Sequence, residues 1–560
     1  MAMKIRIAMA QLDSTVGDLV GNAERAVAAI QQAKEQGVHL VILPEMFITG
    51  YPTNDLLFEN GFVEENEKVL KEIVAPQTKG IAAIIGGVLR EKKEQEKKGE
   101  QVSPPVYNVA AVVNDGEVVC LVKKTLLPNY DVFDEKRYFR AGTKEEIRPV
   151  RLPLAGRAQR VGIEICEDLW DEDYEDKVTK LLYERGADFI VNISASPFYV
   201  GKGSEREGLV KRHLKKSPVP FIYVNMVGGQ DELVFDGGSF AADCRGNIIA
   251  RAAGFEEEIL VFNLDADTWT GAEVPAPPYS KEEEIIRAHT LNLRDYFQKQ
   301  GCFKGIVVGS SGGIDSAYTL YIATQAIGAD KVMSVSMPSR FSSEHSRDDA
   351  ARLAENLGVR HVVVPIEEMF EAGMATFERA FGKTEFGLAE ENDQARCRMQ
   401  ILMKISRKYD YLVCTTGNKS EISTGYFTLF GDGAGGKNIP GDLYKTEIYK
   451  IVRYINREKE IIPQNILLKA PSAELAPDQK DSDTLPPYSE LDPILKLFVE
   501  DCLSIKEIVS RGYGRELVEK VARLYKNSEF KRDQIPRGIK VSRKAYGIGR
   551  RMPITNQWHG

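Results

Sequence analysis

The chain has 560 residues, 43% of them hydrophobic and 28% charged, which is typical of a globular protein of roughly two to four domains. Its 82 acidic and 74 basic side chains give a net charge of −8, which excludes an overall basic field for nucleic acid or anionic lipid. The cysteines, at 120, 166, 244, 302, 397, 414 and 502, form no CxxC pair, so the sequence indicates neither a disulfide framework nor a zinc site. We therefore expect a reducing cytoplasm.

The first half of the chain alternates short apolar strands with helices. The N-terminal segment predicts a strand at 5–12 rather than a signal peptide, and no apolar run reaches the ~20 residues of a membrane helix. Residues 22–37 have helical spacing and end on Gly37, a plausible C-cap. Residues 38–45 predict a strand with Glu45 at its carboxyl end.

Two connections in this half have clear local signals. The Asn-Asp-Gly at 114–116 lies between two apolar runs and predicts a hairpin turn. The charge run at 91–101 favours a solvated loop between strands over a binding tail.

A change of composition divides the chain. The segment around 265–282 is rich in Pro, Ala and polar residues and lacks periodicity, so we predict a first domain at 1–265, a linker at 266–282 and a second domain at 283–560. In the second half a helix precedes a strand–loop–helix unit, and further strands alternate with helical stretches. That alternation predicts a doubly wound parallel sheet, so both halves belong to the α/β class.

Three polar residues of the first half stand at or just after strand ends. They are Glu45, Lys124 and Cys166. A thiol nucleophile needs a base or a nearby cation, and no His falls at a comparable strand end, so a carboxylate base with a lysine for the oxyanion is favoured. The neighbours Glu164, Glu167 and Asp168 would raise the pKa of the thiol. Taken singly, a buried Cys is more often a small core residue, and a Glu at a strand end is more often solvated.

The flanking sequence favours the catalytic interpretation. LPEMFITGYP, KKTLLPNYDVFDEKRYF and GIEICEDLW together resemble the carbon–nitrogen hydrolase (nitrilase) superfamily. The resemblance implies a four-layer αββα sandwich with Glu45 as general base, Lys124 as oxyanion stabiliser and Cys166 as nucleophile. Lys124 is chosen over Lys123 because the family motif places its lysine three residues before a Leu-Pro pair, and Glu135 resembles the supporting glutamate.

The same resemblance implies a set of glutamine contacts. These residues are Tyr130, Glu167, Ser196 and Lys202. Lys202 replaces what is often an arginine, so that a bidentate contact with the α-carboxylate would become a point-charge contact. A surface lysine in a glycine-flanked loop is the alternative interpretation of Lys202.

The segment GIVVGSSGGIDS (305–316) is the most specific pattern in the second half. An apolar strand leads into a Gly/Ser loop and then a helix, an arrangement that lets backbone N–H groups and a helix N-terminus approach a phosphate. It lacks the Walker lysine and resembles the ATP pyrophosphatase loop, which implies cleavage of ATP to AMP and pyrophosphate. Asp315 could hold Mg²⁺ beside the pyrophosphate. The implied ATP-binding residues are Gly309, Ser310, Ser311, Gly312, Gly313, Ile314, Asp315, Ser316 and Thr416.

A second glycine-rich segment, GDGAGGKN (431–438), nearly matches a Walker loop. Its last residue, Asn438, cannot supply the hydroxyl for Mg²⁺, and no apolar strand precedes it. We therefore predict a mobile loop over the active site.

Five longer motifs resemble NAD synthetase. They occupy 387–402, 414–433, 442–456, 471–495 and 530–538. The resemblance implies contacts with deamido-NAD from Asn392, Glu421, Lys445 and Lys531, with Lys445 at a phosphate, and a Mg²⁺ site formed by Asp315 and Glu421. Singly, Glu421 could cap a helix, Lys531 could be a surface charge and Asn392 could be a turn residue.

Together the two resemblances, over roughly 1–265 and 280–560, imply the glutamine-dependent NAD⁺ synthetase family. The implied reaction is the last step of NAD biosynthesis: ammonia from glutamine displaces AMP from adenylated deamido-NAD. It implies ATP, glutamine and deamido-NAD as substrates, Mg²⁺ as cofactor, a homo-oligomer, and no nucleic-acid or membrane partner. Three alternatives stay open, namely another acceptor for the same chemistry, a regulatory protein descended from the enzyme, and an amidase with a nucleotide-sensing domain.

Overall fold

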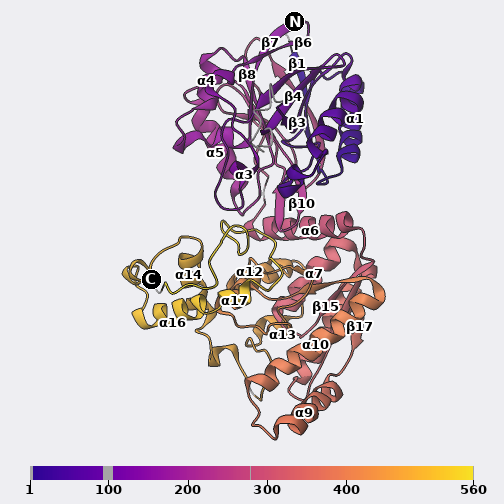
Figure 1. The fold of residues 1–560 in the computed structure, drawn as a ribbon, viewed down its shortest axis with the longest axis vertical. Helices are drawn as coiled ribbons and strands as arrows, with labels where there is room; N and C mark the ends of the chain where they lie inside the picture. The colour runs from indigo at the N-terminus through magenta and orange to yellow at the C-terminus, as the bar shows by residue number, and fades with distance from the viewer. Residues whose placement is uncertain (1–3, 92–104, 278, 478, 559–560) are drawn as a thin grey trace, which may run out of the picture. The chain divides into compact units, whose positions relative to one another are not determined.

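The computed structural model describes residues 4–91, 105–277, 279–477 and 479–558, which form two compact units (Figure 1). The units are Met1–Tyr279 and Ser280–Gly560, so the division lies within the segment predicted as a linker. The charge run after Glu91 lies outside the described residues. Among the residues described, no helix is both long enough and apolar enough to cross a membrane.

Two mixed β-sheets form the centre of the first unit, with strand orders β14-β1-β2-β3-β4-β5 and β13-β12-β9-β8-β7-β6. Strands of the first sheet are β1 (Lys4–Gln11), β2 (Leu40–Ile42), β3 (Ala82–Arg90), β4 (Val106–Asn114), β5 (Glu117–Lys123) and β14 (Glu258–Asp265). Strands of the second sheet are β6 (Val150–Leu154), β7 (Arg157–Ile165), β8 (Phe189–Ser194), β9 (Phe221–Asn225), β12 (Phe240–Ala242) and β13 (Ile248–Arg251). The strands β10 (Val227–Gln230) and β11 (Leu233–Asp236) pair separately.

Successive side chains of each strand point to opposite faces of the sheet and so pack into different layers. In β1, Ile5, Ile7 and Met9 pack between the two sheets, whereas Ala8 and Ala10 face the helix α1 (Leu19–Glu35). The helices α4 (Val178–Glu184) and α5 (Lys202–Leu214) cover the second sheet through a separate apolar cluster. The remaining helices of this unit are α2 (Phe62–Val69) and α3 (Glu135–Tyr138). The predicted four-layer αββα arrangement is confirmed.

The end of β2 shows how the sequence positions Glu45. The strand stops at Ile42, three residues before the predicted end, and the chain then passes close to β3. Gly86 of β3 permits that approach, because a Cβ there would lie 2.2 Å from Met46 N and 2.4 Å from Pro44 O. The predicted hairpin is confirmed, with Asp115 at φ 51° and Gly116 at φ 95° between β4 and β5.

The second unit is built on a parallel sheet with the order β17-β16-β15-β18-β19. Its strands are β15 (Gly305–Gly309), β16 (Val332–Ser336), β17 (Arg360–Val363), β18 (Tyr411–Thr415) and β19 (Lys437–Asn438). The chain runs outward from β15 to β17, then returns to the other side of β15 with β18. The predicted doubly wound sheet is confirmed, and its direction reverses between β15 and β18, where such sheets bind ligands.

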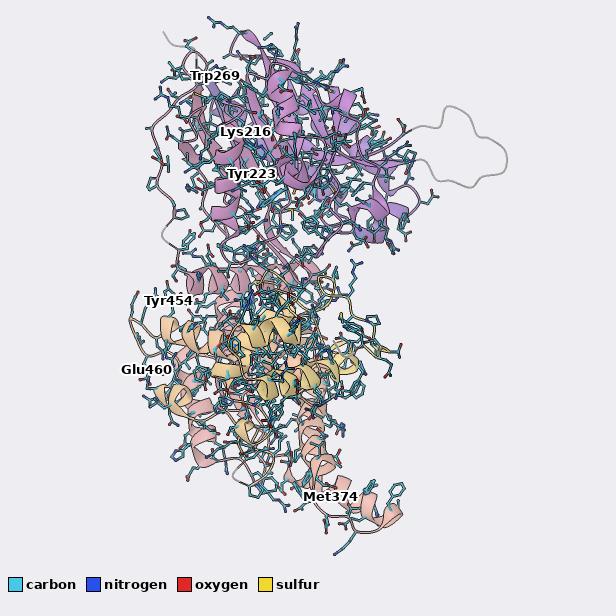
Figure 2. All side chains as sticks on the ribbon, turned by 90° about the vertical axis from the view of Figure 1, so that its left-hand side faces the viewer. Lys216, Tyr223, Trp269, Met374, Tyr454 and Glu460 are labelled. Carbon is cyan, nitrogen blue, oxygen red and sulfur yellow. The ribbon has the colours of Figure 1, made fainter. Side chains whose placement is uncertain are left out.

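Helices connect and flank these strands. They are α6 (Lys281–Gln300), α7 (Ile314–Ile327), α8 (Glu344–Leu357), α9 (Glu367–Phe381), α10 (Leu388–Tyr409), α11 (Lys419–Thr424), α12 (Lys445–Ile455), α13 (Gln464–Leu468), α14 (Tyr488–Val499), α15 (Ile505–Ser510), α16 (Arg515–Lys526) and α17 (Glu529–Arg532). The helix α9, which carries Met374, extends away from the sheet (Figure 2) and leaves Phe377 and Phe381 exposed. By contrast, α14 to α16 share a compact apolar cluster.

The glycine-rich segment 431–438 differs from its prediction at its carboxyl end. Lys437 and Asn438 form β19, which pairs with Cys414 and Thr415 of β18. The Lys437 side chain is buried, with Nζ 4.5 Å from the centre of the Tyr296 ring. The prediction of a mobile loop is therefore wrong for these two residues, because they complete the edge of the sheet. Asp432 and Ala434 line a cavity, as a loop beside a site would.

Candidate active sites

A buried group of charged side chains lies where strands of the first unit end. Glu45 follows β2, Lys124 follows β5 directly, and Cys166 follows β7 directly. Since β2 and β5 belong to one sheet and β7 to the other, both sheets contribute to this site. The three residues singled out in the sequence are all buried.

Lys124 lies between two carboxylates. Its Nζ is 2.7 Å from Glu45 Oε1 and 2.8 Å from Glu135 Oε2. Burial alone would lower the pKa of Lys124, but the carboxylates of Glu135 and Glu45 raise it well above its ordinary value, so the side chain stays an ammonium. Lys123 instead pairs with Glu146 at 3.0 Å nearer the surface, in agreement with the choice of Lys124 from the motif.

Further hydrogen bonds fix the two carboxylates. Asn108 Nδ2 donates to Glu45 Oε1 at 2.7 Å, and the backbone N–H of Ala195 donates to Glu45 Oε2 at 2.8 Å. The hydroxyl of Tyr51 donates to Glu135 at 3.1 Å. Glu45 is thus held by a lysine, an amide and a backbone group, and its orientation is set before any substrate arrives.

Cys166 opens a short turn, Cys166–Leu169, with a left-handed φ of 45°. Few residues other than glycine adopt this conformation, and it is a recurrent feature of functional sites. Burial raises the pKa of the thiol well above its ordinary value, and the Glu45 carboxylate raises it further, while Lys124 opposes that rise. The free site therefore holds a thiol beside a carboxylate that can accept its proton.

The acidic neighbours Asp168 and Glu164 of Cys166 make hydrogen bonds that the sequence did not indicate. Asp168 accepts backbone hydrogen bonds from Thr125 at 3.1 Å and Leu126 at 2.8 Å, which joins the Cys166 turn to the chain after Lys124. Glu164 accepts from Thr179 Oγ1 at 2.9 Å and from Asn192 Nδ2 at 3.0 Å. Of the three acids expected to raise the thiol pKa, Glu167 is among its largest causes. The main carboxylate neighbours of the thiol are Glu45 and Glu135, with a smaller effect of Glu167.

Among the predicted glutamine contacts, Tyr130 and Glu167 meet directly. The Tyr130 hydroxyl donates to Glu167 Oε2 at 3.0 Å, and the Tyr174 hydroxyl donates to Glu167 Oε1 at 2.9 Å. Burial raises the pKa of Glu167, and Lys124 opposes that rise. Tyr174 was not identified from the sequence, because an isolated tyrosine eight residues after Cys166 gives no signal of its partner.

Lys202 and Arg206 lie on the same helix, and Arg206 contacts Ser196. Lys202 begins α5, and its Nζ lies 3.5 Å from the centre of the Trp170 ring, so it is not the surface lysine of the alternative interpretation. Burial, followed by the charge of Arg206, lowers the pKa of Lys202 to about 8. Arg206 is fully buried, bonds both oxygens of Asp236 at 2.8 and 2.9 Å, and donates to Ser196 O at 2.9 Å. Arg206 follows Lys202 by four residues on α5, so the two side chains share one face of the helix. This spacing could have identified Arg206 from the sequence.

The second unit contains a cavity of about 660 Å³ at the carboxyl ends of β15, β16 and β18. Its lining includes every residue predicted for ATP and deamido-NAD. These are Gly309, Ser310, Ser311, Gly312, Gly313, Ile314, Asp315, Ser316, Asn392, Thr416, Glu421, Lys445 and Lys531. Two of the hydroxyls at its base, Ser310 Oγ and Thr415 Oγ1, are buried and have no hydrogen-bond partner among the described residues.

The loop between β15 and α7 has the compact form that the sequence indicates. Gly312 adopts a φ of 72°, and a Cβ there would lie 2.3 Å from the carbonyl oxygen of Ser346 in α8. Ser316 Oγ donates to Gly313 O at 2.9 Å and so closes the loop onto the first turn of α7. A phosphate could approach the backbone closely here.

Lys445 lies between two carboxylates in this cavity, as Lys124 does in the first unit. Its Nζ is 2.6 Å from Asp315 Oδ2 and 3.3 Å from Glu421 Oε1. Asn418 joins the two acids, since its Nδ2 donates to Asp315 Oδ1 at 3.1 Å and its N–H donates to Glu421 Oε2 at 3.1 Å. Glu421 also caps α11 with Asn418, as the alternative interpretation of Glu421 has it.

The carboxylates of Asp315 and Glu421 fit a divalent hard cation. Burial raises the pKa of Glu421; Lys445 opposes that rise and Asp315 adds to it. Two facing carboxylates of this kind gain from a cation between them, and Mg²⁺ is commonly held by one or two carboxylates with substrate phosphates. No group of three or more His, Cys, Asp or Glu side chains able to hold a metal occurs in the described part of the chain.

Asn392 and Lys531 line the cavity from other elements. Asn392 lies in α10, which excludes the turn interpretation, and its Oδ1 accepts from Thr428 Oγ1 at 2.6 Å. Lys531 Nζ donates to Gly425 O and Phe427 O, both at 2.8 Å, so it is attached to a loop of the cavity wall rather than free at the surface. Both residues thus meet the segment 425–428.

Comparison with known proteins gives the same division of the chain. Residues 6–273 match the carbon–nitrogen hydrolase family and residues 285–535 match the NAD synthase family. The chain is 41% identical to the glutamine-dependent NAD(+) synthetase of Synechocystis sp. and 40% identical to that of Thermotoga maritima, in each case over 99% of both chains. The chain belongs to the glutamine-dependent NAD⁺ synthetase family.

Solved structures of glutamine-dependent NAD⁺ synthetases extend this likeness to the fold. The Acinetobacter baumannii protein, in complex with ADP, shares 35% identity and a TM-score of 0.77 over 99% of each chain. The Cytophaga hutchinsonii protein has a TM-score of 0.81 at 23% identity, covering 99% of this chain and 98% of its own, and shows the shared fold alone.

Proposed function

We propose that this synthetase amidates deamido-NAD to NAD⁺, taking nitrogen from glutamine and cleaving ATP to AMP and pyrophosphate. The observation that carries the proposal is the presence, in one chain, of the buried Glu45–Lys124–Cys166 group and of a cavity lined by the residues that the NAD synthase resemblance implies. Each group suits one half of the reaction.

The first half-reaction begins with a proton transfer. The Cys166 thiol passes its proton to the Glu45 carboxylate as the sulfur attacks the glutamine amide carbon. The Lys124 ammonium, which its two carboxylates keep charged, faces the oxyanion that forms. Glu45 then returns the proton to the leaving nitrogen, ammonia departs, and water activated by Glu45 hydrolyses the thioester to glutamate.

Charge decides which side chains would hold glutamine. Glu167, oriented by two tyrosine hydroxyls, suits the α-ammonium group. Lys202, held above Trp170, suits the α-carboxylate as a single point charge. Ser196, whose carbonyl and hydroxyl both face Arg206, is positioned through that buried arginine.

In the second half-reaction the nicotinate carboxylate of deamido-NAD attacks the α-phosphate of ATP and pyrophosphate leaves. The Ser310–Gly313 loop and the N-terminus of α7 would bind the phosphates, and Lys445 would meet a phosphate oxygen. Asp315 and Glu421 would hold Mg²⁺, which when bound supplies positive charge beside the pyrophosphate. Ammonia then attacks the carbonyl carbon of the adenylate, AMP leaves, and the nicotinamide is formed.

Ammonia must reach the adenylate before it becomes ammonium. We propose a closed passage for it, a homo-oligomer that supports that passage, and a cytoplasmic location. The cytoplasmic location is supported by the seven cysteines, all of which are free.

One assay tests the proposal. Purified protein is supplied with ATP, Mg²⁺, deamido-NAD and either glutamine or an ammonium salt, and NAD⁺ is measured. We expect NAD⁺ from both donors. Glutamine hydrolysis without NAD⁺ from either donor would favour an amidase with a nucleotide-sensing domain, and product formation only with a purine nucleotide or aspartate would identify another acceptor.

A further inference from the structure

A fully buried asparagine lies beside the candidate nucleophile of the first unit and is not used in the reaction proposed above. Asn192 belongs to β8 and is in register with Glu164 of the neighbouring strand β7, two residues before Cys166. Ile190 of β8 packs toward the helices that cover this sheet, so the side chain of Asn192, two residues further on, faces the same layer. A polar side chain in that apolar layer needs a physical reason.

Hydrogen bonds fix both ends of the Asn192 amide. Its Oδ1 accepts from Ser194 Oγ at 2.7 Å, and its Nδ2 donates to Glu164 Oε1 at 3.0 Å. The same Nδ2 also donates to the carbonyl oxygen of Cys166, over a longer distance of 3.4 Å. The two shorter bonds orient the amide and so direct its remaining N–H at the carbonyl group of the nucleophile.

Cys166 needs such support because it leaves the strand in an unfavourable conformation. The ladder between β7 and β8 ends at the pair Ile165–Ile193, and Cys166 follows with a left-handed φ of 45°. This conformation costs a non-glycine residue free energy and persists where the surrounding structure holds it. Asn192 reaches past the last pair of the ladder to the carbonyl group of that residue.

The end of β8 holds the proposed general base as well. The backbone N–H of Ala195 donates to Glu45 Oε2 at 2.8 Å. Asn192 and Ala195 belong to one short segment, so this segment contacts both partners of the proposed proton transfer, Cys166 and Glu45. A misplacement of about 1 Å between reacting groups can slow a reaction roughly 100-fold, so a shift of Cys166 relative to β8 should be visible in the rate.

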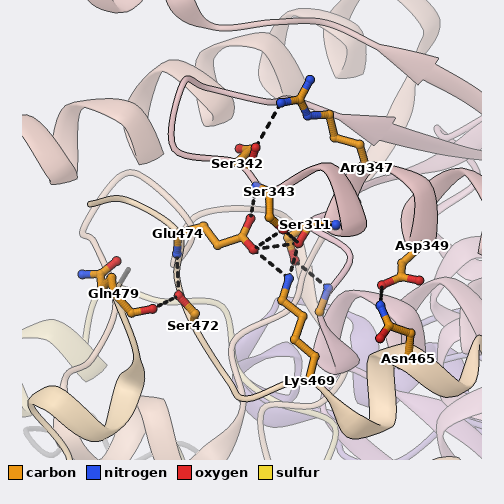
Figure 3. Close-up of polar contacts among 12 residues, drawn as sticks. Ser311, Ser342, Ser343, Arg347, Asp349, Asn465, Lys469, Ser472, Glu474 and Gln479 are labelled. Carbon is orange, nitrogen blue, oxygen red and sulfur yellow. Dashed lines mark hydrogen bonds and ion pairs between the residues drawn. The ribbon is translucent and has the colours of Figure 1, made fainter. Parts of the chain in front are cut away.

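Glu164, the other partner of Asn192, is an acid among uncharged donors. Burial raises its pKa to about 8, although the bonds from Asn192 and Thr179 oppose that rise, so the carboxyl is mostly protonated at neutral pH. Glu474 of the second unit is the opposite case. Burial raises its pKa too, but the Lys469 ammonium at 2.7 Å helps to hold the pKa below its ordinary value (Figure 3). An uncharged side chain can therefore replace Glu164 without breaking an ion pair.

We propose that Asn192 is a positioning residue of the first site: its side-chain N–H holds the carbonyl group of Cys166 and thereby keeps the thiol facing Glu45. This inference rests on the proposed function, in which Cys166 is the nucleophile. Asn192 exchanges no proton and touches no substrate, and it acts through the backbone of Cys166. A buried polar network whose members are all hydrogen-bonded adds little stability over an apolar one, but it rigidifies a single arrangement.

The test removes the N–H both with and without a loss of stability. Asn192→Leu is close in size but cannot donate, and it leaves Glu164 without one partner, so its denaturant midpoint should fall. Asn192→Leu combined with Glu164→Met removes both polar groups and should recover most of that midpoint. Both variants should hydrolyse glutamine with a kcat roughly 10- to 100-fold below the parent and a KM within about threefold of it. Alkylation of Cys166 by iodoacetamide, measured on its peptide by mass spectrometry, should slow in both.

Glu164→Gln is the matched control. The amide keeps an acceptor for Asn192 and leaves the contact with Cys166 in place, so kcat and the alkylation rate should stay within about twofold of the parent. Synthesis of NAD⁺ from an ammonium salt should continue at the parent rate in all three variants, because the second unit does not use this network.

Recovery of the parent kcat together with stability in the double variant would overturn the proposal, since Asn192 would then support the fold alone. A double variant as unstable as Asn192→Leu would overturn it as well, because the Asn192–Glu164 bond would then not be the one that holds the amide. Alkylation needs no glutamine, so its outcome is separate from that of the proposed reaction. Slower alkylation in both Asn192 variants of a chain that hydrolyses no glutamine would refute only that reaction.

Discussion

Asn418 offers a test of the geometry at the two proposed metal-binding acids. Its side chain is fully buried, caps α11 through Oδ1 to Glu421 N at 3.0 Å, and donates through Nδ2 to Asp315 at 3.1 Å. Asn418→Ser separates the two functions, because serine is as good an N-cap residue but is too short to reach Asp315. Asn418→Ala removes both.

The magnitudes follow from these contacts. A hydrogen bond to a charged group contributes about 1.5–3 kcal/mol, and we take the lower end because Asp315 lines a cavity where water can replace the amide. Asn418→Ser should therefore slow NAD⁺ synthesis roughly tenfold with both nitrogen donors while leaving the free energy of unfolding nearly unchanged. Asn418→Ala should in addition lower the free energy of unfolding by about 1 kcal/mol through loss of the cap.

The assay measures NAD⁺ formation against Mg²⁺ concentration, glutamine hydrolysis, and denaturant unfolding. The serine variant should need more Mg²⁺ for half-maximal synthesis and should hydrolyse glutamine at the parent rate. Our reasoning would be refuted by a serine variant with the parent's Mg²⁺ dependence, or by one that loses activity only in proportion to its stability.

The first site yields three further predictions. Cys166→Ala should make NAD⁺ from ammonium salts, at a rate that rises with pH as more NH₃ forms, and none from glutamine; glutamine-driven synthesis by this variant would exclude Cys166 as nucleophile. Because the pKa of Lys202 is about 8, its ammonium is lost as pH rises through that value, so KM for glutamine should rise above pH 8 and Lys202→Arg should abolish the rise. Lys124→Met leaves Glu45 and Glu135 buried without their cation and should cost about 3–5 kcal/mol of unfolding free energy, measured by denaturant titration against a Lys123→Met control.

The sequence was sufficient to place the candidate residues that stand at the ends of strands. Glu45, Lys124 and Cys166 follow strands whose ends meet, and the Ser310–Gly313 loop follows a central parallel strand, so local patterns and family motifs located them. Neither helix nor strand patterns could indicate that Asn418 reaches Asp315, which is 103 residues distant in sequence. That contact exists only because β15 and β18 are neighbours in the sheet.

Other differences have the same origin. The glycine-rich segment before Lys437 suggested mobility, but pairing with β18 converts its end into an edge strand. Of the acids next to Cys166 in sequence, Glu167 acts on the thiol as expected, whereas the turn at Cys166 also directs Asp168 toward backbone N–H groups, which the sequence did not indicate. In both cases a tertiary contact that the local sequence does not encode decided the role of the residue.

The two sites share one arrangement, a lysine between two carboxylates, and its surroundings differ in a way that matters for mechanism. Around Lys124, the side chains of Glu45 and Glu135 are 1% and 5% exposed, and these two carboxylates hold the pKa of Lys124 well above its ordinary value. Around Lys445, the side chains of Asp315 and Glu421 are 14% and 17% exposed and line an open cavity. On the proposed function, a divalent cation arriving with a nucleotide would take over these carboxylates and leave the Lys445 ammonium beside the phosphates. A lysine that keeps both carboxylate partners suits an oxyanion that forms at a fixed position. A lysine whose carboxylate partners can pass to another cation suits a substrate that binds with its own negative charge and later leaves.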